Sequence, residues 1–469
     1  MKFIAVVLFA MLLGAPASAA PSHFDHIVLM VQENRTPDNL FYALCSQRPC
    51  STRSGSGTYD IKLDHWLDKN SKRGSIHPRP LPLTTLYSPE HSHAAFLALC
   101  DYDAVTRACL MDGAGDVRCK DCPPNSSFTY VDNSNGIIDP YLFLAENYGW
   151  ANYMFQTNQG PSFPAHQFLF GGTSAPNSRD DHKGTFAAEN VKEDSTANGC
   201  IAPAGSAVAL INAKGVEFKS VYPCFEHETL GDLLDRARVS WRYYTPGAGS
   251  LWTAPDAIRH ICRPGADPTV CTGAIWRAHV ALHPTDVLGD IKNCQLPGLS
   301  WVIPSGQYSD HADSNNGGGP LWVATVIDAI GRSSCKNSDG TSYWNSTAIV
   351  VTWDDFGGFY DHEPPTFLPY PEGGYQYGFR VPLLFVSAYT PVGYISNVRQ
   401  DFGSIVRFVE FNFGIPLGSL TFADARTTAS LSEFYNLSAT PRPFQSIAVT
   451  TPSRSFDGGD PRLEPPDDD

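Results

Sequence analysis

The sequence predicts an α/β protein, a three-layer sandwich in which helices cover both faces of a mostly parallel central sheet. Short runs rich in β-branched residues indicate strands buried on both faces, and segments with helical spacing of apolar residues alternate with them. Such alternation is typical of parallel sheets. We expect strands at residues 27–31, 239–244, 299–304, 349–353 and 381–386. We expect helices at residues 138–148, 254–261, 322–330 and 404–411.

The run at residues 349–353 ends in TWDDFGG, which delivers Asp354 and Asp355 into a glycine turn. Two carboxylates that face one site repel each other, so the pair needs a proton or a cation. Gly357 and Gly358 let the chain reverse behind the acids, and open α/β sheets bind ligands beyond such strand ends. An ordinary solvated Asp-Asp turn is the alternative interpretation.

Polar groups follow two other predicted strands in the same way, which favours a shared site. The first strand leads into Glu33 and Asn34, and the run that starts at Leu299 leads into Asp310 and His311. Hard cations prefer carboxylate and amide oxygens, and zinc also accepts imidazole. We therefore expect a divalent metal ion at these strand ends, and the ligand types leave zinc, calcium, magnesium and iron open.

The Gly160-Pro161 turn in QGPSFPAHQFLFGG presents Ser162 at the start of an apolar, helix-like stretch. One role for a serine there is to cap the helix. A helix N-terminus also offers free amides and the positive end of a dipole, which suit a phosphate oxygen. A serine hydroxyl becomes a good nucleophile only when a base or a metal activates it, and the expected cation would do so.

Four histidines lie near these motifs: His91, His93, His311 and His362. A loop histidine is as often a hydrogen-bonding residue as a catalytic one. Phosphoryl transfer needs cations and proton donors around the equatorial oxygens and the leaving oxygen. We expect His93 and His311 to be those donors.

The chain shows no clear linker, so we expect one domain over residues 21–452, with polar insertions at 45–86 and 171–223. The Pro- and Asp-rich tail at 453–469 is expected to be disordered. Residues 1–20 have the layout of a secretory signal peptide: a basic start, an apolar stretch too short to span a bilayer, and small residues at the end.

All twelve cysteines lie beyond that signal, and an even count in an exported chain favours disulfides. Local pairing is plausible for Cys45 with Cys50, Cys100 with Cys109, Cys200 with Cys224, and Cys262 with Cys271. The CxxC of Cys119 and Cys122 is expected to be a structural disulfide rather than a redox or metal site. We expect a secreted or periplasmic protein.

The formal charge is −15, and loss of Lys2 with the signal would make it one unit more negative. So acidic a chain is a poor candidate for binding nucleic acid, or an anionic membrane by charge alone. No later stretch approaches the ~20 apolar residues of a membrane helix, so we expect no transmembrane anchor. An anionic substrate would need a local cation.

Together these segments resemble the secreted acid phosphatase and bacterial phospholipase C family, within the alkaline phosphatase-like superfamily. The matching motifs, in family order, are VQENRTPDNLF from Val31, HSH at 91–93, QGPSFPAHQFLFGG from Gln159, SDH ending at His311, TWDDFGGFYDHEPP from Thr352 and FRVPLLFVS from Phe379.

The resemblance implies a phosphoserine formed on Ser162 and then hydrolysed by water. It implies His93 and His311 around the phosphoryl group, with Asn34, His91 and His362 as substrate-binding residues. The metal ligands that it implies are Glu33, Asn34, Ser162, Asp354 and Asp355.

Three positions depart from the family pattern. Members often have Asp-Glu where this chain has Asp354 and Asp355, and many phospholipase-like members have threonine where this chain has Ser162. Phe402 follows Asp401 where relatives commonly carry histidine, which puts any role of that histidine in doubt here.

The expected function is an exported, metal-dependent phosphoric ester hydrolase of the acid phosphatase kind, acting on a small phosphate ester. Phospholipase C activity on phospholipid head groups is the alternative within enzymes. A disulfide-rich exported binding protein that kept the fold and lost catalysis is the alternative outside them.

Overall fold

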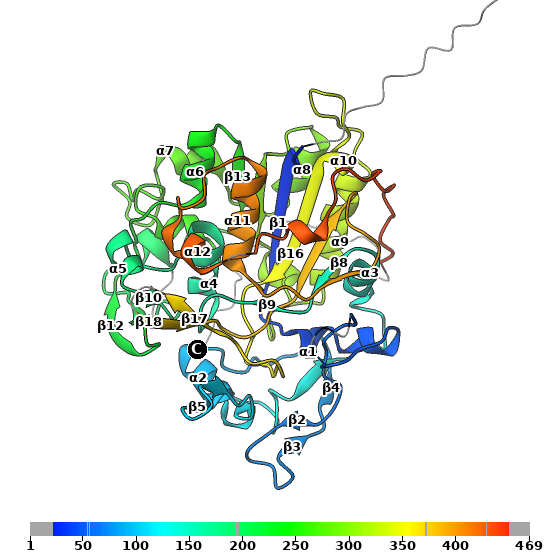
Figure 1. Cartoon of the computed structure of the whole chain (residues 1–469). Coiled ribbons are helices and arrows are strands. Elements are labelled where there is room, and N and C mark those ends of the chain that lie inside the picture. Colours follow the sequence, from blue (N-terminus) through cyan, green and yellow to red (C-terminus); the bar gives the residue numbers. More distant parts are fainter. Residues whose placement is uncertain are drawn as a thin grey trace, which may run out of the picture.

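The computed structural model describes residues 22–449 except 54, 56, 193–196, 371–372 and 428. Its centre is an eight-stranded sheet in the order β14-β13-β15-β1-β16-β19-β8-β20 (Figure 1). The strands are β1 (His26–Gln32), β8 (Gly149–Ala151), β13 (Trp241–Tyr244), β14 (Val280–Ala281), β15 (Leu299–Val302), β16 (Thr347–Trp353), β19 (Leu383–Ser387) and β20 (Tyr394–Ser396).

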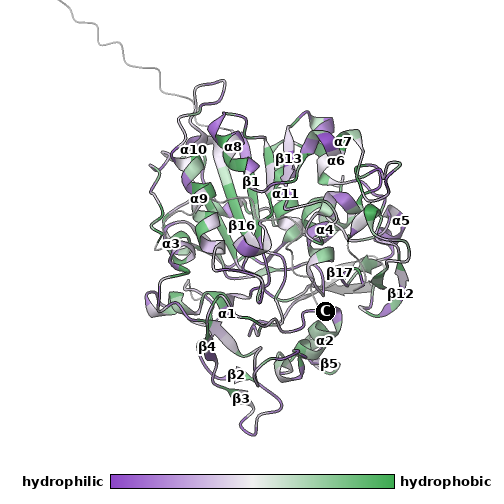
Figure 2. Ribbon diagram, turned by 180° about the vertical axis from the view of Figure 1, so that it is seen from behind, coloured by the Kyte–Doolittle hydropathy of each residue, from purple (hydrophilic) through white to green (hydrophobic). Residues whose placement is uncertain are grey.

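The middle of the sheet is parallel and fully buried. Strand β1 pairs in parallel with both β15 and β16, and every residue of β1, β15 and β16 is buried. Their Val-, Ile- and Leu-rich runs therefore need apolar cover on both faces, and Figure 2 shows β1 and β16 as hydrophobic ribbons. Strand β19 is antiparallel to β16 and β8, and it begins directly after Pro382 because proline cannot donate to the ladder.

Helices lie on both faces of this sheet, which confirms the predicted three-layer α/β sandwich (Figure 1). One layer holds α3 (Asp139–Asn147), α8 (Asp286–Lys292), α9 (Gly319–Gly331) and α10 (Tyr343–Ser346). The other holds α4 (Ser162–Gly171), α6 (Leu230–Ala237), α11 (Phe402–Asn412) and α12 (Thr421–Arg426), with α7 (Ala274–His279) beside β13. The helix expected over 254–261 is only a short 3₁₀ turn, Ala254–Ala257, because Ile258 takes an extended backbone conformation and forms a β-bridge with Phe225 instead of continuing the helix.

Below the sheet, the chain forms a lower lobe, defined here as residues 42–131 (Figure 1). It contains β2 (Trp66–Leu67), β3 (Ser75–Ile76), β4 (Arg79–Leu81), α2 (His93–Cys100), β5 (Tyr102–Asp103), β6 (Ala108–Cys109) and β7 (Thr129–Val131), after the short helix α1 (Pro37–Leu40). The lobe shares an apolar cluster with the segment that follows β16, in which Phe96 and Phe128 of the lobe pack with Phe356 and Tyr360. It therefore covers the edge of the sheet at which β1 and β16 end.

Smaller elements surround the other side of that edge. A three-stranded sheet consists of β10 (Phe186–Ala187), β11 (Val208–Ile211) and β12 (Glu217–Val221), near α5 (Ser178–His182). The hairpin of β17 (Phe367–Tyr370) and β18 (Gly373–Gln376) connects β16 to β19, and β9 (Met154–Phe155) pairs with β21 (Gln400–Asp401).

All twelve cysteines are paired, as expected for an oxidising compartment. The four expected neighbour pairs and the CxxC pair form disulfides. The sixth, Cys294–Cys335, joins the ends of α8 and α9. The expected signal peptide and C-terminal tail lie outside the described residues, and within those residues no helix is long and apolar enough to cross a membrane.

The disulfides predict a difference in stabilisation that follows loop length. Cys294–Cys335 closes 41 residues, whereas Cys45–Cys50 closes 5. Chain-entropy arguments give about 4 kcal/mol for the long loop and about 2 kcal/mol for the short one. Replacing both cysteines of each pair with serine should therefore lower the free energy of unfolding more for the long loop, as denaturant titration of the two variants measures. Equal losses would contradict the entropic account.

Candidate metal and nucleophile site

The site begins where β1 and β16 end side by side. Their parallel register pairs Gln32 with Trp353, so the next residues, Glu33 and Asp354, leave neighbouring strands at the same level. The Asp354 amide donates to the Gln32 carbonyl oxygen at 2.9 Å, which extends the ladder into the site. Glu33, Asp354 and Asp355 are all 0% exposed. The prediction that these strand ends converge is thus confirmed, and the solvated-turn alternative is wrong.

Two backbone features bring the turns of these strands together. Asn34 adopts a left-handed conformation (φ 61°), and its amide donates to Asp354 Oδ1 at 2.9 Å. Gly357 also has a positive φ, and a Cβ there would lie 2.3 Å from the Asn34 carbonyl oxygen. Glycine is therefore required at 357 for two independent reasons, backbone conformation and close approach.

Ser162 is the first residue of α4, and its hydroxyl points toward the acids. Its Oγ lies 3.4 Å from Glu33 Oε2 and 3.3 Å from Asp355 Oδ2. The N-cap of α4 is Pro161, which makes no side-chain cap bond, so Ser162 does not act as the capping serine. Instead Asn190 Oδ1 accepts the Phe163 amide at 2.9 Å and supplies the cap from another segment.

The loop before Ser162 is fixed by side-chain hydrogen bonds. Gln156 Nε2 donates to the carbonyl oxygens of Asn158 and Gly160, and Asn158 Nδ2 donates to those of Gly160 and Pro161. A Cβ at Gly160 would lie 2.1 Å from the Ala188 carbonyl oxygen. The turn that presents the hydroxyl is therefore closely packed.

Sequence reasoning missed His166, which the structure places in the same site. Its Nε2 lies 3.2 Å from Glu33 Oε1 and 3.9 Å from Asp354 Oδ2, and the three side chains form a group that could hold a metal ion. The signal was present in the sequence, because residues four apart share one face of a helix and His166 follows Ser162 by four.

The donor set fits a divalent cation. Asp354 Oδ1 accepts two backbone amides, whereas Asp354 Oδ2 and Asn34 Oδ1 are buried side-chain oxygens with no hydrogen-bond partner within the described chain. A buried oxygen without a partner costs free energy unless it binds something. The Asp354 carboxylate belongs to one cluster with Glu33 and His166, and Asn34 follows Glu33 directly in the chain, an arrangement that a hard cation would satisfy.

His91 and His311 lie together next to Asn34. His91 Nε2 is 3.1 Å from Asn34 Nδ2, so the amide N–H donates to that nitrogen, and the His91 and His311 rings meet edge to face at 5.8 Å. Trp252 also lies beside His311, with ring centroids 6.1 Å apart. The structure therefore places both histidines beside the strand end that carries Asn34, and their expected roles stay predictions.

Asp310 fixes the loop before His311 through hydrogen bonds to buried side chains. Its Oδ2 accepts the Tyr141 hydroxyl at 2.8 Å and the Trp353 indole N–H at 3.0 Å, and its carbonyl oxygen accepts Arg35 Nε at 2.9 Å. Burial raises the pKa of Asp310 to about 6, although Arg35 acts to lower it. Asp310 is thus a positioning residue for the loop that carries His311.

His93 has a different setting from the one expected. Its Nδ1 lies 2.8 Å from the Gln159 carbonyl oxygen and its Nε2 lies 2.9 Å from the Gly215 carbonyl oxygen. Both ring nitrogens therefore contact backbone, and the ring joins the lower lobe to the nucleophile loop and to the β11–β12 turn. A role for His93 as proton donor stays a prediction.

His362 belongs to a separate buried ionic cluster. Its Nδ1 lies 2.8 Å from Asp38 Oδ2 and its Nε2 lies 3.0 Å from Asp60 Oδ1, while Arg380 forms a two-bond ion pair with Asp361. Burial acts to lower the pKa of His362, but Asp38 and Asp60 outweigh it and raise the pKa to about 9. The structure thus places His362 against two carboxylates, and its expected role in substrate binding stays a prediction.

The family model described as the phosphoesterase family matches residues 24–416. The chain belongs to the phosphoesterase family. Every candidate ligand and the candidate nucleophile lie within the matched range.

Curated relatives are phospholipases C. A hemolytic phospholipase C of Pseudomonas aeruginosa is 23% identical over 442 residues, which cover 83% of this chain and 53% of the relative. A non-hemolytic phospholipase C of the same species is 23% identical over 437 residues, covering 85% and 56%. Phospholipase C B of Mycobacterium tuberculosis is 29% identical over 247 residues, covering 45% and 43%. The chain spans about half the length of these relatives.

One similar solved structure is titled as a protein in the alkaline phosphatase superfamily from Vibrio parahaemolyticus. It is 13% identical, with a TM-score of 0.31, and the match covers 60% of this chain and 61% of that one. So loose a likeness supports no detail of the site.

The His362 cluster predicts a specific pH dependence of stability. Because the folded-state pKa is raised from 6.5 to about 9, the contribution of this histidine is complete below pH 6.5 and is lost as the pH rises through 9. It amounts to about 3 kcal/mol. The wild-type free energy of unfolding should fall over this range relative to the variant His362→Gln, as denaturant titration at several pH values measures.

The matched control is His65→Gln, because the His65 side chain is 74% exposed. That variant should keep the wild-type pH profile. An unchanged profile in His362→Gln would show that the cluster does not hold the imidazolium ion.

Proposed function

We propose that this chain is a metal-dependent phosphoric ester hydrolase that works through a phosphoserine on Ser162. The observation that carries the proposal is the position of the Ser162 hydroxyl, 3.3–3.4 Å from two buried carboxylates at the start of a ten-residue helix. Membership of the phosphoesterase family supports the reaction class. The phospholipase C relatives support a phosphate ester as substrate.

Ser162 would attack phosphorus with its Oγ, forming a phosphoserine as the bond from phosphorus to the alcohol oxygen breaks. The hydroxyl proton already faces Glu33 Oε2 and Asp355 Oδ2, so it leaves toward the carboxylates. A divalent cation held by Glu33, Asn34, Asp354 and Asp355 would supply positive charge for the phosphoryl oxygens. The dipole of α4 adds positive potential at the same point.

The departing alcohol oxygen needs a proton, and His311 is the donor that the geometry favours. It is buried beside His91, and its Nδ1 lies 2.6 Å from the Ala312 carbonyl oxygen. This contact fixes the ring, so the proton for the alcohol would come from Nε2. His91, bonded to the Asn34 amide, would hold the phosphoryl group in place. Water then attacks phosphorus from the side the alcohol left, releasing phosphate and restoring Ser162.

We further propose that the protein is exported, as one domain over residues 21–452. Six disulfides without a free cysteine favour an oxidising compartment, and the expected signal peptide would direct the chain there. Ser162 stands where many phospholipase-like members have threonine, and by the family resemblance this favours the phosphatase branch. The phospholipase C relatives favour the second candidate function, hydrolysis at phospholipid head groups.

Replacing Ser162 with alanine should abolish turnover of a chromogenic phosphate monoester, a loss of at least 10³-fold, because no other hydroxyl would replace the nucleophile. The change removes one oxygen and should leave the fold intact, as circular dichroism and the unfolding midpoint can verify. Retained activity in folded Ser162→Ala would overturn the assignment of the nucleophile.

Metal content separates an enzyme from a binding protein that has lost catalysis. Elemental analysis after mild purification should show a divalent metal in the wild-type protein and its loss in Asp354→Ala, because Asp354 Oδ2 is one of the unpartnered oxygens. The control is Asp339→Ala, at an exposed turn. A protein without metal that hydrolyses no ester in a broad panel would favour the binding protein.

A comparison of substrates distinguishes the two candidate functions, phosphatase and phospholipase C. We expect turnover of the chromogenic monoester to exceed that of phosphatidylcholine, measured by phosphate and phosphocholine release at equal phosphorus concentration. The same Ser162→Ala variant should lose both activities. Activity confined to the lipid would reverse the order and identify a phospholipase C.

A further inference from the structure

Exposed apolar side chains are unevenly distributed over the described residues. Seventeen large apolar side chains in that part of the chain are exposed, and ten of them lie in two segments, residues 63–110 of the lower lobe and residues 216–222 around β12. Scattered exposed apolar residues are normal on a protein surface, but a concentration of them marks an interaction surface. We call these ten side chains the apolar rim: Leu63, Leu67, Leu86, Leu97, Tyr102, Val105, Leu110, Val216, Phe218 and Tyr222.

The two segments lie together on the side of the molecule where the site is. The contact between His93 Nε2 and the Gly215 carbonyl oxygen joins the first residue of α2 to the turn before β12. Figures 1 and 2, seen from opposite sides, both place α2, β5 and β12 below the sheet at the same corner. Both segments therefore belong to the part of the molecule that covers the strand ends of β1 and β16.

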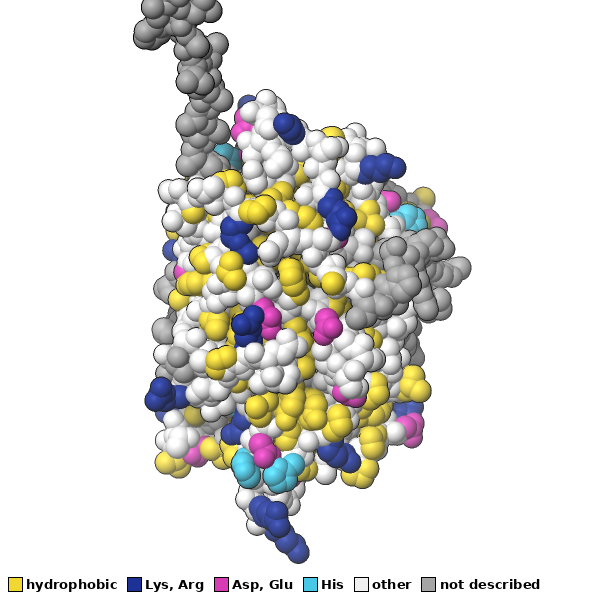
Figure 3. Space-filling view, turned by 90° about the vertical axis from the view of Figure 1, so that its right-hand side faces the viewer, with side chains coloured by type: hydrophobic (Ala, Val, Ile, Leu, Met, Phe, Trp, Pro, Cys, Tyr) yellow, Lys and Arg dark blue, Asp and Glu magenta, His cyan; other side chains and the backbone are white. Residues whose placement is uncertain are grey.

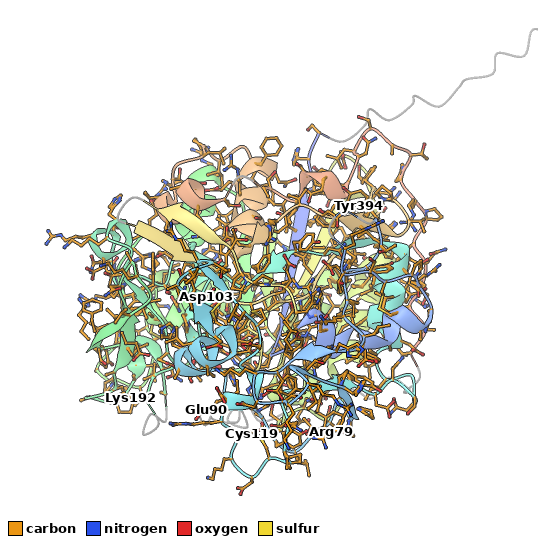
Figure 4. All side chains as sticks on the ribbon, turned by 60° about the horizontal axis from the view of Figure 1, so that its bottom comes forward. Arg79, Glu90, Asp103, Cys119, Lys192 and Tyr394 are labelled. Carbon is orange, nitrogen blue, oxygen red and sulfur yellow. A yellow bond between two sulfur atoms is a disulfide. The ribbon has the colours of Figure 1, made fainter. Side chains whose placement is uncertain are left out.

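Val105, the most exposed rim residue between α2 and β6, lies on a rigid hairpin. Val105 is 91% exposed at the tip of the β5–β6 turn, and Leu97 on α2 is 50% exposed. The disulfide Cys100–Cys109 closes the base of this hairpin, and Asp103 accepts the Val105 amide at 2.9 Å. Figure 4, which brings the lower side forward, shows Asp103 on this segment. A rigid tip loses little conformational entropy when it is buried by a partner.

Hydrophobic atoms also gather on a neighbouring face. Figure 3 shows them grouped in the lower part of the molecule, with basic and acidic side chains interspersed. Leu86, in the stretch that leads to His91, is 91% exposed. Exposed apolar side chains are therefore also present on this face, which is turned away from β12.

Charge favours a neutral partner surface. The chain has a formal charge of −15, and the two rim segments together carry six acidic and six basic side chains, so they hold no excess of basic groups. Lys219 lies over the Phe218 ring at 5.3 Å, a pairing of aromatic ring and cation that suits the boundary between water and an apolar phase. Attraction to an anionic membrane would need an excess of basic groups.

We propose that the apolar rim docks the protein on a zwitterionic lipid surface, with the end of the sheet that carries the candidate site turned toward that surface. The inference rests on the proposed phosphoric ester hydrolase and names the lipid interface as its partner. Insertion of Val105, Leu97 and Phe218 among the lipids holds the molecule there. Docking uses apolar burial, so it requires neither an anionic lipid nor turnover.

The test is binding to phosphatidylcholine vesicles, measured by co-sedimentation with the full-length protein in 0.15 M salt, a concentration that screens surface charge. Wild-type protein should sediment with the vesicles, and the double variant Val105→Asp, Leu97→Asp should bind at least about tenfold more weakly. Phe218→Asp should weaken binding independently, since it lies on the other segment. Chromogenic monoester hydrolysis should be unchanged in all three proteins.

The matched control is Val392→Asp. Val392 is 66% exposed but lies just before β20, at the opposite end of the sheet from the site, so this variant should bind as the wild type does. Failure of the wild type to bind phosphatidylcholine, binding to anionic vesicles alone, or equal binding by the double variant would each overturn the proposal. Vesicle binding without any ester hydrolysis would instead contradict the proposed function and support the docking proposal.

Discussion

Mutual repulsion among three buried carboxylates is the constraint on which this structure depends. Glu33, Asp354 and Asp355 are fully buried at adjacent strand ends, where water cannot screen them. The surrounding chain is arranged to tolerate that concentration of negative charge. Backbone amides meet Asp354 and Asp355, His166 meets Glu33, and two buried oxygens are left for a cation. The start of α4 faces the same point with its positive end.

The sheet explains why the acids can be placed so accurately. Parallel strands β1 and β16 are paired over seven residues, so a shift of one strand would move every apolar side chain out of its position. The hydrophobic core thus fixes the relative height of Glu33 and Asp354. Asn34 and Gly357, both with positive φ, then fold the two turns against each other. The left-handed backbone of Asn34 is tolerated because the core fixes both strands.

Much of this arrangement could be predicted from sequence because it follows from local patterns. Apolar runs located the central strands, and polar groups at their ends located Glu33, Asn34 and the Asp354-Asp355 pair. His166 was missed because the helix that carries it is mostly apolar. Its place in the site follows only once Ser162, on the same face of that helix, is known to be in the site. The surroundings of His362 and His93 could not be predicted, since their partners, Asp60 and Gly215, are distant in sequence and no local pattern pairs them. No local pattern pairs Cys294 with Cys335 either, and only the pairing of the other ten cysteines leaves these two as partners.

The ionic cluster beneath the site also bears on how this architecture can change. Asp60 comes from the lower lobe, yet it contacts His362 and its carbonyl oxygen accepts a hydrogen bond from Arg380 in the central body. Asp38 and Asp361 complete the same cluster from two other segments. The lobe is therefore not a detachable module. Excising it to obtain a minimal catalytic core would remove the Asp60 carboxylate from His362 and the Asp60 carbonyl oxygen from Arg380, so shortened versions of this scaffold must replace those two partners.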